Sequence, residues 1–94
     1  ITITVKAEII CESGYTIEGL QSQIENEVEE YFLSLRKKWS EEKTGITVRK
    51  AGVENAIYVI EGVQDVKNVL LDDATENITL QETEVPVRGD VICS

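Results

Sequence analysis

The sequence predicts an α+β fold, a two-layer sandwich in which two helices pack on one face of a mostly antiparallel sheet of three to five strands. Three features of the 94 residues support this architecture. The first residues alternate between apolar and polar, two later segments show the apolar spacing of helices, and the last third contains short β-branched runs between polar turns. A chain of this length forms one domain, so we expect residues 1–94 to be a single domain.

The chain should begin with a strand that leads directly into a long helix. From Ile1 to Cys11 the odd positions are apolar, which is the period of a half-buried strand. Ser13-Gly14 interrupts this pattern, and Thr16 is placed to cap a helix with Glu18 in its first turn. Apolar residues then recur at steps of three and four over about six turns, which predicts an amphipathic helix. They are Ile17, Leu20, Ile24, Val28, Tyr31, Phe32, Leu35 and Trp39.

Charge on this predicted helix is unevenly distributed. Basic residues occur late, from Arg36 to Lys38, and we expect Lys43-Thr44-Gly45 to end the helix. The charge should therefore follow the helix dipole from end to end. Acidic residues occur early and lie opposite the apolar stripe, where a solvated face is expected; they are Glu25, Glu27, Glu29 and Glu30.

The middle of the chain predicts a short extended segment and a second helix. Ile46 to Arg49 is rich in β-branched residues and is interpreted as an edge strand or an extended lead-in. Gly62 then stands where a left-handed cap would end the second helix. The inner side of that helix has the spacing i, i+3, i+4, i+7, formed by Val53, Ala56, Ile57 and Ile60.

Three further strands should complete the sheet. Val66 to Leu71 is apolar in both registers, so its facing stays unassigned. Ile78 to Leu80 and Val85 to Cys93 follow after polar turns, and short turns favour antiparallel pairing. Pro86 lacks an amide donor, so the last strand should lie at an edge or be irregular near its start. Its apolar residues are expected on one side: Val85, Val87, Val91 and Cys93.

Composition favours a protein partner. With 18 acidic and 9 basic residues the formal net charge is −9, which disfavours binding to nucleic acid or to anionic lipid. No apolar run approaches the ~18 residues of a membrane span. The two cysteines, Cys11 and Cys93, have no metal-type spacing and are interpreted as reduced, packed thiols. A disulfide between them is the alternative, and it would need an oxidising compartment.

The residues offer little for catalysis or metal binding. Because the chain has no His, a Ser-His or Cys-His nucleophile cannot be assembled within it. A carboxylate pair at Glu25 and Glu29 is possible by spacing, but a solvated face is the simpler interpretation. Arg36-Lys37-Lys38 beside Trp39 is attributed to the helix end and the core, not to nucleic-acid binding. We therefore expect no catalytic residue, no cofactor and no metal.

Two further motifs are assigned no function. The polar segment Asp72-Asp73-Ala74-Thr75-Glu76-Asn77 offers clustered oxygens but lacks the spaced pattern of a calcium loop, so we interpret it as a turn. Asn77-Ile78-Thr79 matches the glycosylation sequon, and we treat that match as chance.

Short motifs in matching order give the chain a family resemblance. They are Gly14-Tyr15-Thr16, Tyr31-Phe32-Leu33-Ser34-Leu35, Trp39, Ile46-Thr47-Val48-Arg49, Ala56-Ile57, Ile60, Gly62-Val63-Gln64-Asp65-Val66, Asn77-Ile78-Thr79-Leu80 and Glu84-Val85-Pro86-Val87-Arg88-Gly89. In this pattern, which covers nearly the whole chain, the sequence resembles the C-terminal region of phage baseplate J-like proteins. The chain begins with Ile1 and has no Met, so we expect it to be a C-terminal fragment of a longer protein of this kind.

The resemblance implies a structural, non-enzymatic component of a phage or prophage tail baseplate. The implied partners are other baseplate or tail proteins and further copies of the same chain. The implied locations are the virion tail baseplate and, during assembly, the host cytoplasm. The resemblance supplies no binding residues. By elimination, we expect partner contacts at the exposed sheet edges and on the acidic helix face at Glu25, Glu29 and Glu30.

Two other classes of function remain open. A small-ligand-binding regulatory domain of a multidomain protein can use the same two-layer architecture, with its pocket between subunits. A small enzyme of acylphosphatase-like shape would need an anion-cradling loop with an Arg beside it. Arg36, Arg49 and Arg88 do not follow such a loop, which disfavours the enzyme.

Overall fold

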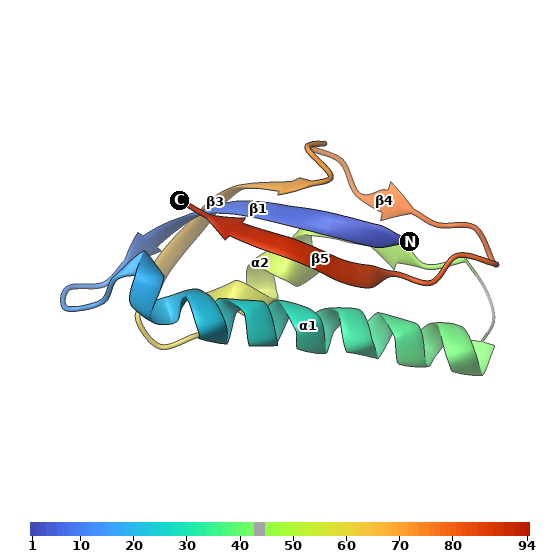
Figure 1. Ribbon diagram of the computed structural model, residues 1–94, viewed down its shortest axis with the longest axis horizontal. Helices are drawn as coiled ribbons and strands as arrows, with labels where there is room; N and C mark the ends of the chain where they lie inside the picture. The colour runs from blue at the N-terminus through green and yellow to red at the C-terminus, as the bar shows by residue number, and fades with distance from the viewer. Residues whose placement is uncertain (43–44) are drawn as a thin grey trace.

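A computed structural model describes residues 1–42 and 45–94 of the chain (Figure 1). The expected end of the long helix at Lys43-Thr44-Gly45 therefore lies partly outside the described residues. In chain order the elements are β1 (Thr2–Cys11), α1 (Ile17–Glu42), β2 (Thr47–Val48), α2 (Lys50–Tyr58), β3 (Val63–Leu71), β4 (Ile78–Thr79) and β5 (Val87–Cys93).

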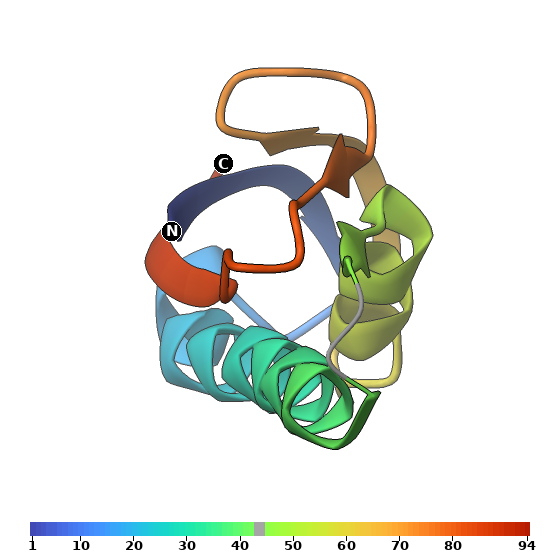
Figure 2. The same cartoon turned by 90° about the vertical axis from the view of Figure 1, so that its right-hand side faces the viewer.

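The helices and the main sheet form two layers. The sheet has the strand order β3-β1-β5, and β2 and β4 form a second, two-stranded sheet. Both helices cover the same face of the main sheet, α1 beneath β1 and β5 and α2 beneath β3 (Figure 2). Two of the three ladders in the described residues are antiparallel. The predicted α+β sandwich with two helices on one face is confirmed.

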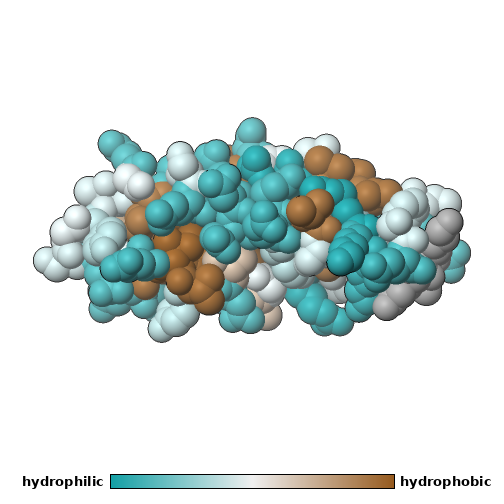
Figure 3. All heavy atoms as spheres, turned by 90° about the horizontal axis from the view of Figure 1, so that it is seen from below, coloured by the Kyte–Doolittle hydropathy of each residue, from teal (hydrophilic) through white to brown (hydrophobic). Residues whose placement is uncertain are grey.

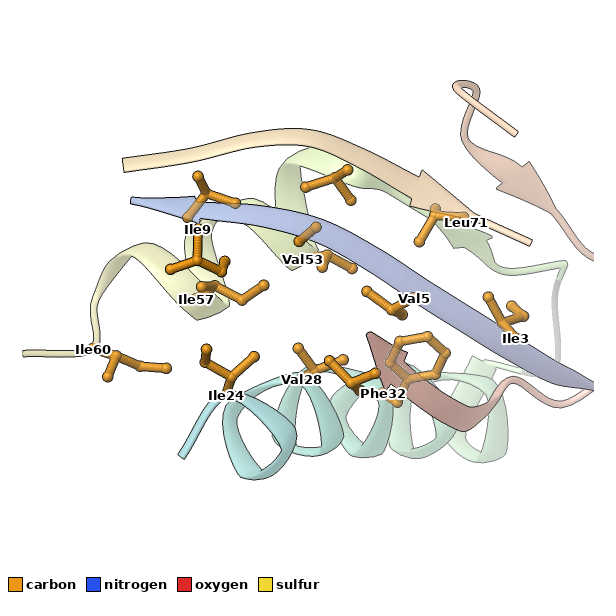
Figure 4. Close-up of a cluster of buried hydrophobic side chains, with 14 of the residues drawn as sticks. Ile3, Val5, Ile9, Ile24, Val28, Phe32, Val53, Ile57, Ile60 and Leu71 are labelled. Carbon is orange, nitrogen blue, oxygen red and sulfur yellow. The ribbon is translucent and has the colours of Figure 1, made fainter. Parts of the chain in front are cut away.

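The central strand β1 supplies the middle of the core. Its predicted alternation is confirmed, because Ile3, Val5, Ala7 and Ile9 are all buried. The side chains of Ile3, Val5 and Ile9 point toward apolar residues of both helices, as the close-up of the core shows (Figure 4). The helical contribution comes from Ile24, Val28, Phe32, Val53 and Ile57, each with no exposed surface.

The start of α1 is as predicted, but its charge pattern is not. The Thr16 Oγ1 accepts a hydrogen bond from the backbone N–H of Gly19 at 3.0 Å, which satisfies one unpaired donor of the first turn. The helix continues past the basic segment to Glu42, and its last turn contains no basic residue. The expectation that charge follows the dipole from end to end is therefore wrong, because the helix is longer than the basic segment suggested.

The second helix is capped by a distant side chain. Arg49 at the N-cap makes no side-chain capping bond. Instead, the Asn77 Oδ1 accepts a hydrogen bond from the backbone N–H of Lys50 at 2.9 Å. The C-cap residue is Val59, so Gly62 does not cap the helix as expected. Gly62 has the expected left-handed backbone, with φ +100°, but it lies in the turn that leads into β3.

Irregular pairing explains why the facing of β3 could not be read from the sequence. Val63, Val66, Val69 and Leu71 are buried, so the first steps between inward residues are three rather than two. The register against β1 shifts at two places, and Asn68 has a left-handed φ of +50° at one of them. Such bulges add a residue and reverse the side on which later residues point.

The pairing expected for the late strands is wrong. Strand β5 pairs with β1 in parallel, and β4 pairs with β2, so the late strands do not pair with one another. The register of β5 shifts between the partners of Ile3 and Val5, which places Val91 in the core and leaves Val87 exposed. The expectation that both valines share one side fails for this reason. The edge position of β5 and its irregular start after Pro86 are confirmed.

Replacing Gly62 with Ala should be far more destabilising than replacing Gly14. Both glycines have positive φ, which costs an alanine about 1 kcal/mol. A Cβ at Gly62 would also clash with the Tyr15 ring, whereas nothing lies within 4 Å of a Cβ at Gly14. We expect urea unfolding to show a loss of about 1 kcal/mol for G14A and about 2–4 kcal/mol for G62A. Equal losses would mean that the contact between Tyr15 and Gly62 contributes nothing.

Candidate functional site

The polar turn after β3 is held by contacts within the chain. Asp72 and Asp73 both have left-handed backbones, and they form the tight turn between Leu71 and Ala74. The Asp72 Oδ1 accepts a hydrogen bond from the backbone N–H of Thr4 at 2.7 Å, and Asp73 forms a salt bridge with Lys6. Within residues 1–42 and 45–94, no group of three or more His, Cys, Asp or Glu residues could hold a metal ion. The interpretation of this segment as a turn is confirmed.

The acidic face expected on α1 is divided by the structure. Glu30 is exposed, but Glu25 and Glu29 are half-buried rather than opposite the core. The Glu25 carboxylate accepts a hydrogen bond from the Gln21 amide at 3.1 Å. Only Glu30 of the three predicted contact residues therefore has the solvated position that its place in the sequence suggested.

Glu29 lies between two arginines. Its carboxylate is 3.1 Å from a guanidinium nitrogen of Arg36 and 3.7 Å from one of Arg88. Arg36 also donates to the backbone oxygen of Pro86 at 3.2 Å. These contacts join α1 to the start of β5, 50 or more residues away in the sequence. Arg36 therefore joins α1 to the segment before β5, a role that differs from the charge compensation at the helix end that the sequence suggested.

Both edge strands of the main sheet, β5 and β3, have features that hinder pairing with a further strand. At the β5 edge, side chains of α1 occupy two backbone acceptors: Gln21 donates to Val91 at 2.9 Å and Arg36 donates to Pro86. At the β3 edge, the register shifts and the left-handed Asn68 make the strand irregular. Irregular edge strands are poor templates for another strand.

Trp39, which was attributed to the core, is not among the residues of the hydrophobic cluster, and Asn77, whose sequon was assigned no function, makes a structural contact. Trp39 is half-buried, and its indole N–H donates to the backbone oxygen of Glu82 at 2.6 Å. Asn77 caps α2 through its side-chain oxygen, while Ile78 and Thr79 pair with β2. No sequence pattern predicts these contacts, because each joins residues that are at least 27 positions apart.

The two cysteines are free thiols that pack against the core, as expected. Cys93 ends β5, and Cys11 ends β1. Burial, followed by the negative charge of Glu25 and the nearby Cys11, raises the pKa of the Cys93 thiol above its usual value. This thiol is therefore less reactive than an exposed cysteine.

The surface of the described residues has local hollows. One hollow of about 270 Å³ lies at the start of α1, lined by Gly14, Tyr15, Thr16, Gly19, Leu20, Gln23 and Glu61. Another, of about 350 Å³, is lined by Tyr31, Leu35, Lys38, Gly45, Ile46, Thr47 and Arg49. On the helical side, hydrophobic residues gather in separate areas within a mostly hydrophilic surface (Figure 3).

None of the described helices combines the length and the hydropathy that crossing a bilayer would require.

Comparison with known proteins gives one family and one related protein. Residues 3–94 match the family described as Baseplate J-like protein C-terminal domain. The chain is also 28% identical over 89 residues to the phage-like element PBSX protein XkdT of Bacillus subtilis (strain 168). That alignment covers 95% of this chain and 24% of the relative, so the chain spans about a quarter of the relative's length.

Replacing Glu29 with Gln should destabilise the fold, whereas the same change at Glu30 should not. E29Q removes the charge that is paired with Arg36 and Arg88, at a partly exposed site, and we expect a loss of about 1 kcal/mol. E30Q alters an exposed residue and should stay within about 0.5 kcal/mol of the wild type. Urea unfolding at one salt concentration compares them. Identical midpoints would show that the arginine contacts do not stabilise the domain.

The Cys93 thiol should titrate above the pH at which an unfolded thiol does. Because the pKa of the folded thiol is raised, the protonated thiol stabilises the fold fully below the usual thiol pKa, and this contribution is lost as pH rises from that value through the raised pKa. In a C11S variant, reaction of Cys93 with iodoacetamide at pH 8 should be slower in the folded chain than in urea. Equal rates in both states would contradict the raised pKa.

Proposed function

Since this chain belongs to the family of Baseplate J-like protein C-terminal domains, we propose that it acts in the assembly of a phage or prophage tail baseplate through contacts with other proteins. The family is one of phage structural proteins, so its members have a structural role in the tail. The observation that carries the proposal is the extent of the match, which runs from residue 3 to residue 94. It includes every described helix and nearly all of β1.

The organisation of the domain supports a structural rather than a catalytic role. The buried residues are hydrophobic, with no buried polar or charged residue among those described. Several polar side chains bond to other residues of the same chain, including Glu29, Arg36 and Asn77. A body whose polar groups mainly join its own segments is suited to holding a fixed shape within a larger particle.

The proposed partners are other baseplate or tail proteins and further copies of this chain. The net charge of −9 makes nucleic acid and anionic membranes poor partners. In this proposal the 94 residues are the C-terminal domain of a longer protein, and the domain resides in the tail baseplate of the virion after assembly in the host cytoplasm. It has no catalytic function there.

We place one partner contact on the acidic side of α1, at Glu25, Glu29 and Glu30. Glu30 is exposed and is available to a partner. Glu29 is partly exposed, with 43% of its side chain accessible, although it is also paired with Arg36 and Arg88. Glu25 lies one turn earlier on the same side of the helix. A partner with basic residues would complement this side.

Charge reversal on this side should impair assembly without unfolding the domain. We expect the double variant E25K/E30K, made in the full-length protein, to reduce the yield of complete particles seen by electron microscopy, because two repulsive contacts replace attractive ones. Glu29 is left intact because its pairing with two arginines would confound assembly with stability. The matched control is E76K/E82K, which reverses two exposed residues in loops outside α1; the bond from Trp39 of α1 goes to the backbone oxygen of Glu82, which the substitution keeps. Normal particle yield with E25K/E30K would remove this side of the helix from the interface.

A further inference from the structure

We propose that the hollow at the start of α1 receives a Lys or Arg side chain of another protein in the assembly. This inference rests on the proposed function and specifies one of its contact sites. The hollow has a volume of about 270 Å³ and lies between the first turns of α1 and the turn that follows α2. It is therefore formed by two segments that are 38 residues apart in the sequence at their nearest, from Gln23 to Glu61.

Small residues line part of this hollow. Gly14 and Gly19 both line it, and a Cβ at Gly14 would meet nothing within 4 Å. The lining also includes the buried Leu20 and the polar side chains of Thr16 and Gln23. A long side chain with an apolar stem and a polar tip matches this combination of surfaces.

Tyr15 provides a fixed aromatic wall. Its ring lies directly over Gly62, so closely that a Cβ at that position would clash with it. Tyr15 as a whole is nevertheless 40% exposed, which leaves part of the residue available to a ligand. An aromatic ring attracts the ammonium of Lys or the guanidinium of Arg through its quadrupole. The contact with Gly62 sets the position of the ring before any partner arrives.

The charges around the hollow favour a cation. Glu61 lines it, and Glu12 and Glu18 are exposed on the adjoining segments. The negative charge of Glu61 raises the pKa of Tyr15 above its usual value, and Glu12 adds to this effect. The N-terminus of α1 carries a partial positive charge of only about +0.5, which repels a cation. Since the Gly19 N–H is already bonded to Thr16, three carboxylates outweigh the helix end.

An exposed apolar area next to Glu61 indicates that the occupant is part of a protein. Tyr58, the last residue of α2, is 57% exposed, and Val59, its C-cap, is 72% exposed; both lie within three residues of Glu61 in the sequence. A free cation would leave these side chains uncovered. A protein segment with an apolar residue beside its basic one would cover them while its charge enters the hollow.

A titration with a single side chain tests the chemistry of the hollow. The ¹⁵N-labelled chain is titrated with Nα-acetyl-arginine methylamide and, separately, with the uncharged citrulline analogue. We expect saturable shifts of the amide signals of Gly19, Gln23 and Glu61 with the arginine compound only. The E61Q variant should bind about two- to fivefold more weakly, as for an exposed ion pair. The matched control E76Q, at an exposed loop residue, should bind like the wild type.

Three results of the titration would overturn the proposal. Equal shifts with the citrulline compound would exclude recognition of charge. Shifts spread over the whole acidic surface would indicate non-specific attraction. Unchanged affinity in E61Q would remove the hollow as the site. In addition, shifts of the same signals when the chain alone is concentrated would assign the hollow to a second copy of this chain instead of to another protein.

Cross-linking in assembled particles tests the source of the side chain. With p-benzoylphenylalanine in place of Gln23 in the full-length protein, we expect a cross-link to a segment of a different baseplate protein that contains Lys or Arg. A cross-link to a segment without a basic residue, or none in particles that contain the protein, would overturn the proposal. If the protein is absent from purified particles, the proposed function itself fails, while the titration still decides whether the hollow binds a cation.

Discussion

The fold depends on burying the inner face of β1 against both helices at once. Four alternating residues of this strand, from Ile3 to Ile9, are almost completely buried, and β1 is the only strand in the described residues that pairs on both sides. Phe32 and Val28 of α1 cover it from one direction, and Val53 and Ile57 of α2 from the other. Apolar burial of this kind is the dominant favourable term in folding. The other two strands of the main sheet, β3 and β5, pair with the two sides of β1.

Polar contacts then fix segments that the hydrophobic core does not specify. The contacts of Glu29 and Arg36 hold the start of β5 against α1, and Asn77 fixes β4 at the start of α2. Individually such bonds contribute little to stability, but each has a strict geometry. They therefore determine which of several similar packings is adopted. The same contacts reduce the number of side chains that are free to meet a partner.

Local patterns predicted the layers correctly, and contacts between distant residues account for the errors. The alternation of β1, the stripe of α1 and the cap at Thr16 are properties of neighbouring residues, and all were predicted. The facing of β3 and β5 depends on bulges, which are set by pairing with β1 and leave no simple sequence period. The acidic side of α1 could be suggested from neighbouring residues, but the pairing of Glu29 with Arg88 could not, because these two residues are far apart in the sequence. The hollow beside Tyr15 was not foreseen, because it exists only where Gly62 is brought beneath the ring.

The parallel pairing of the first and last strands determines where the two termini lie and in which direction a force between them would act. The amino group of Ile1 bonds to Val85 just before β5 begins, whereas Ser94 bonds to Ala7 and Ile9, near the far end of β1. The two termini are thus separated by about seven residues of strand, roughly 23 Å. Polypeptide joined to one terminus would leave on the opposite flank from polypeptide joined to the other, as Figure 1 shows. A pull between such attachments would run along the strands and shear all their hydrogen bonds together, which is the direction in which a sheet resists extension most strongly.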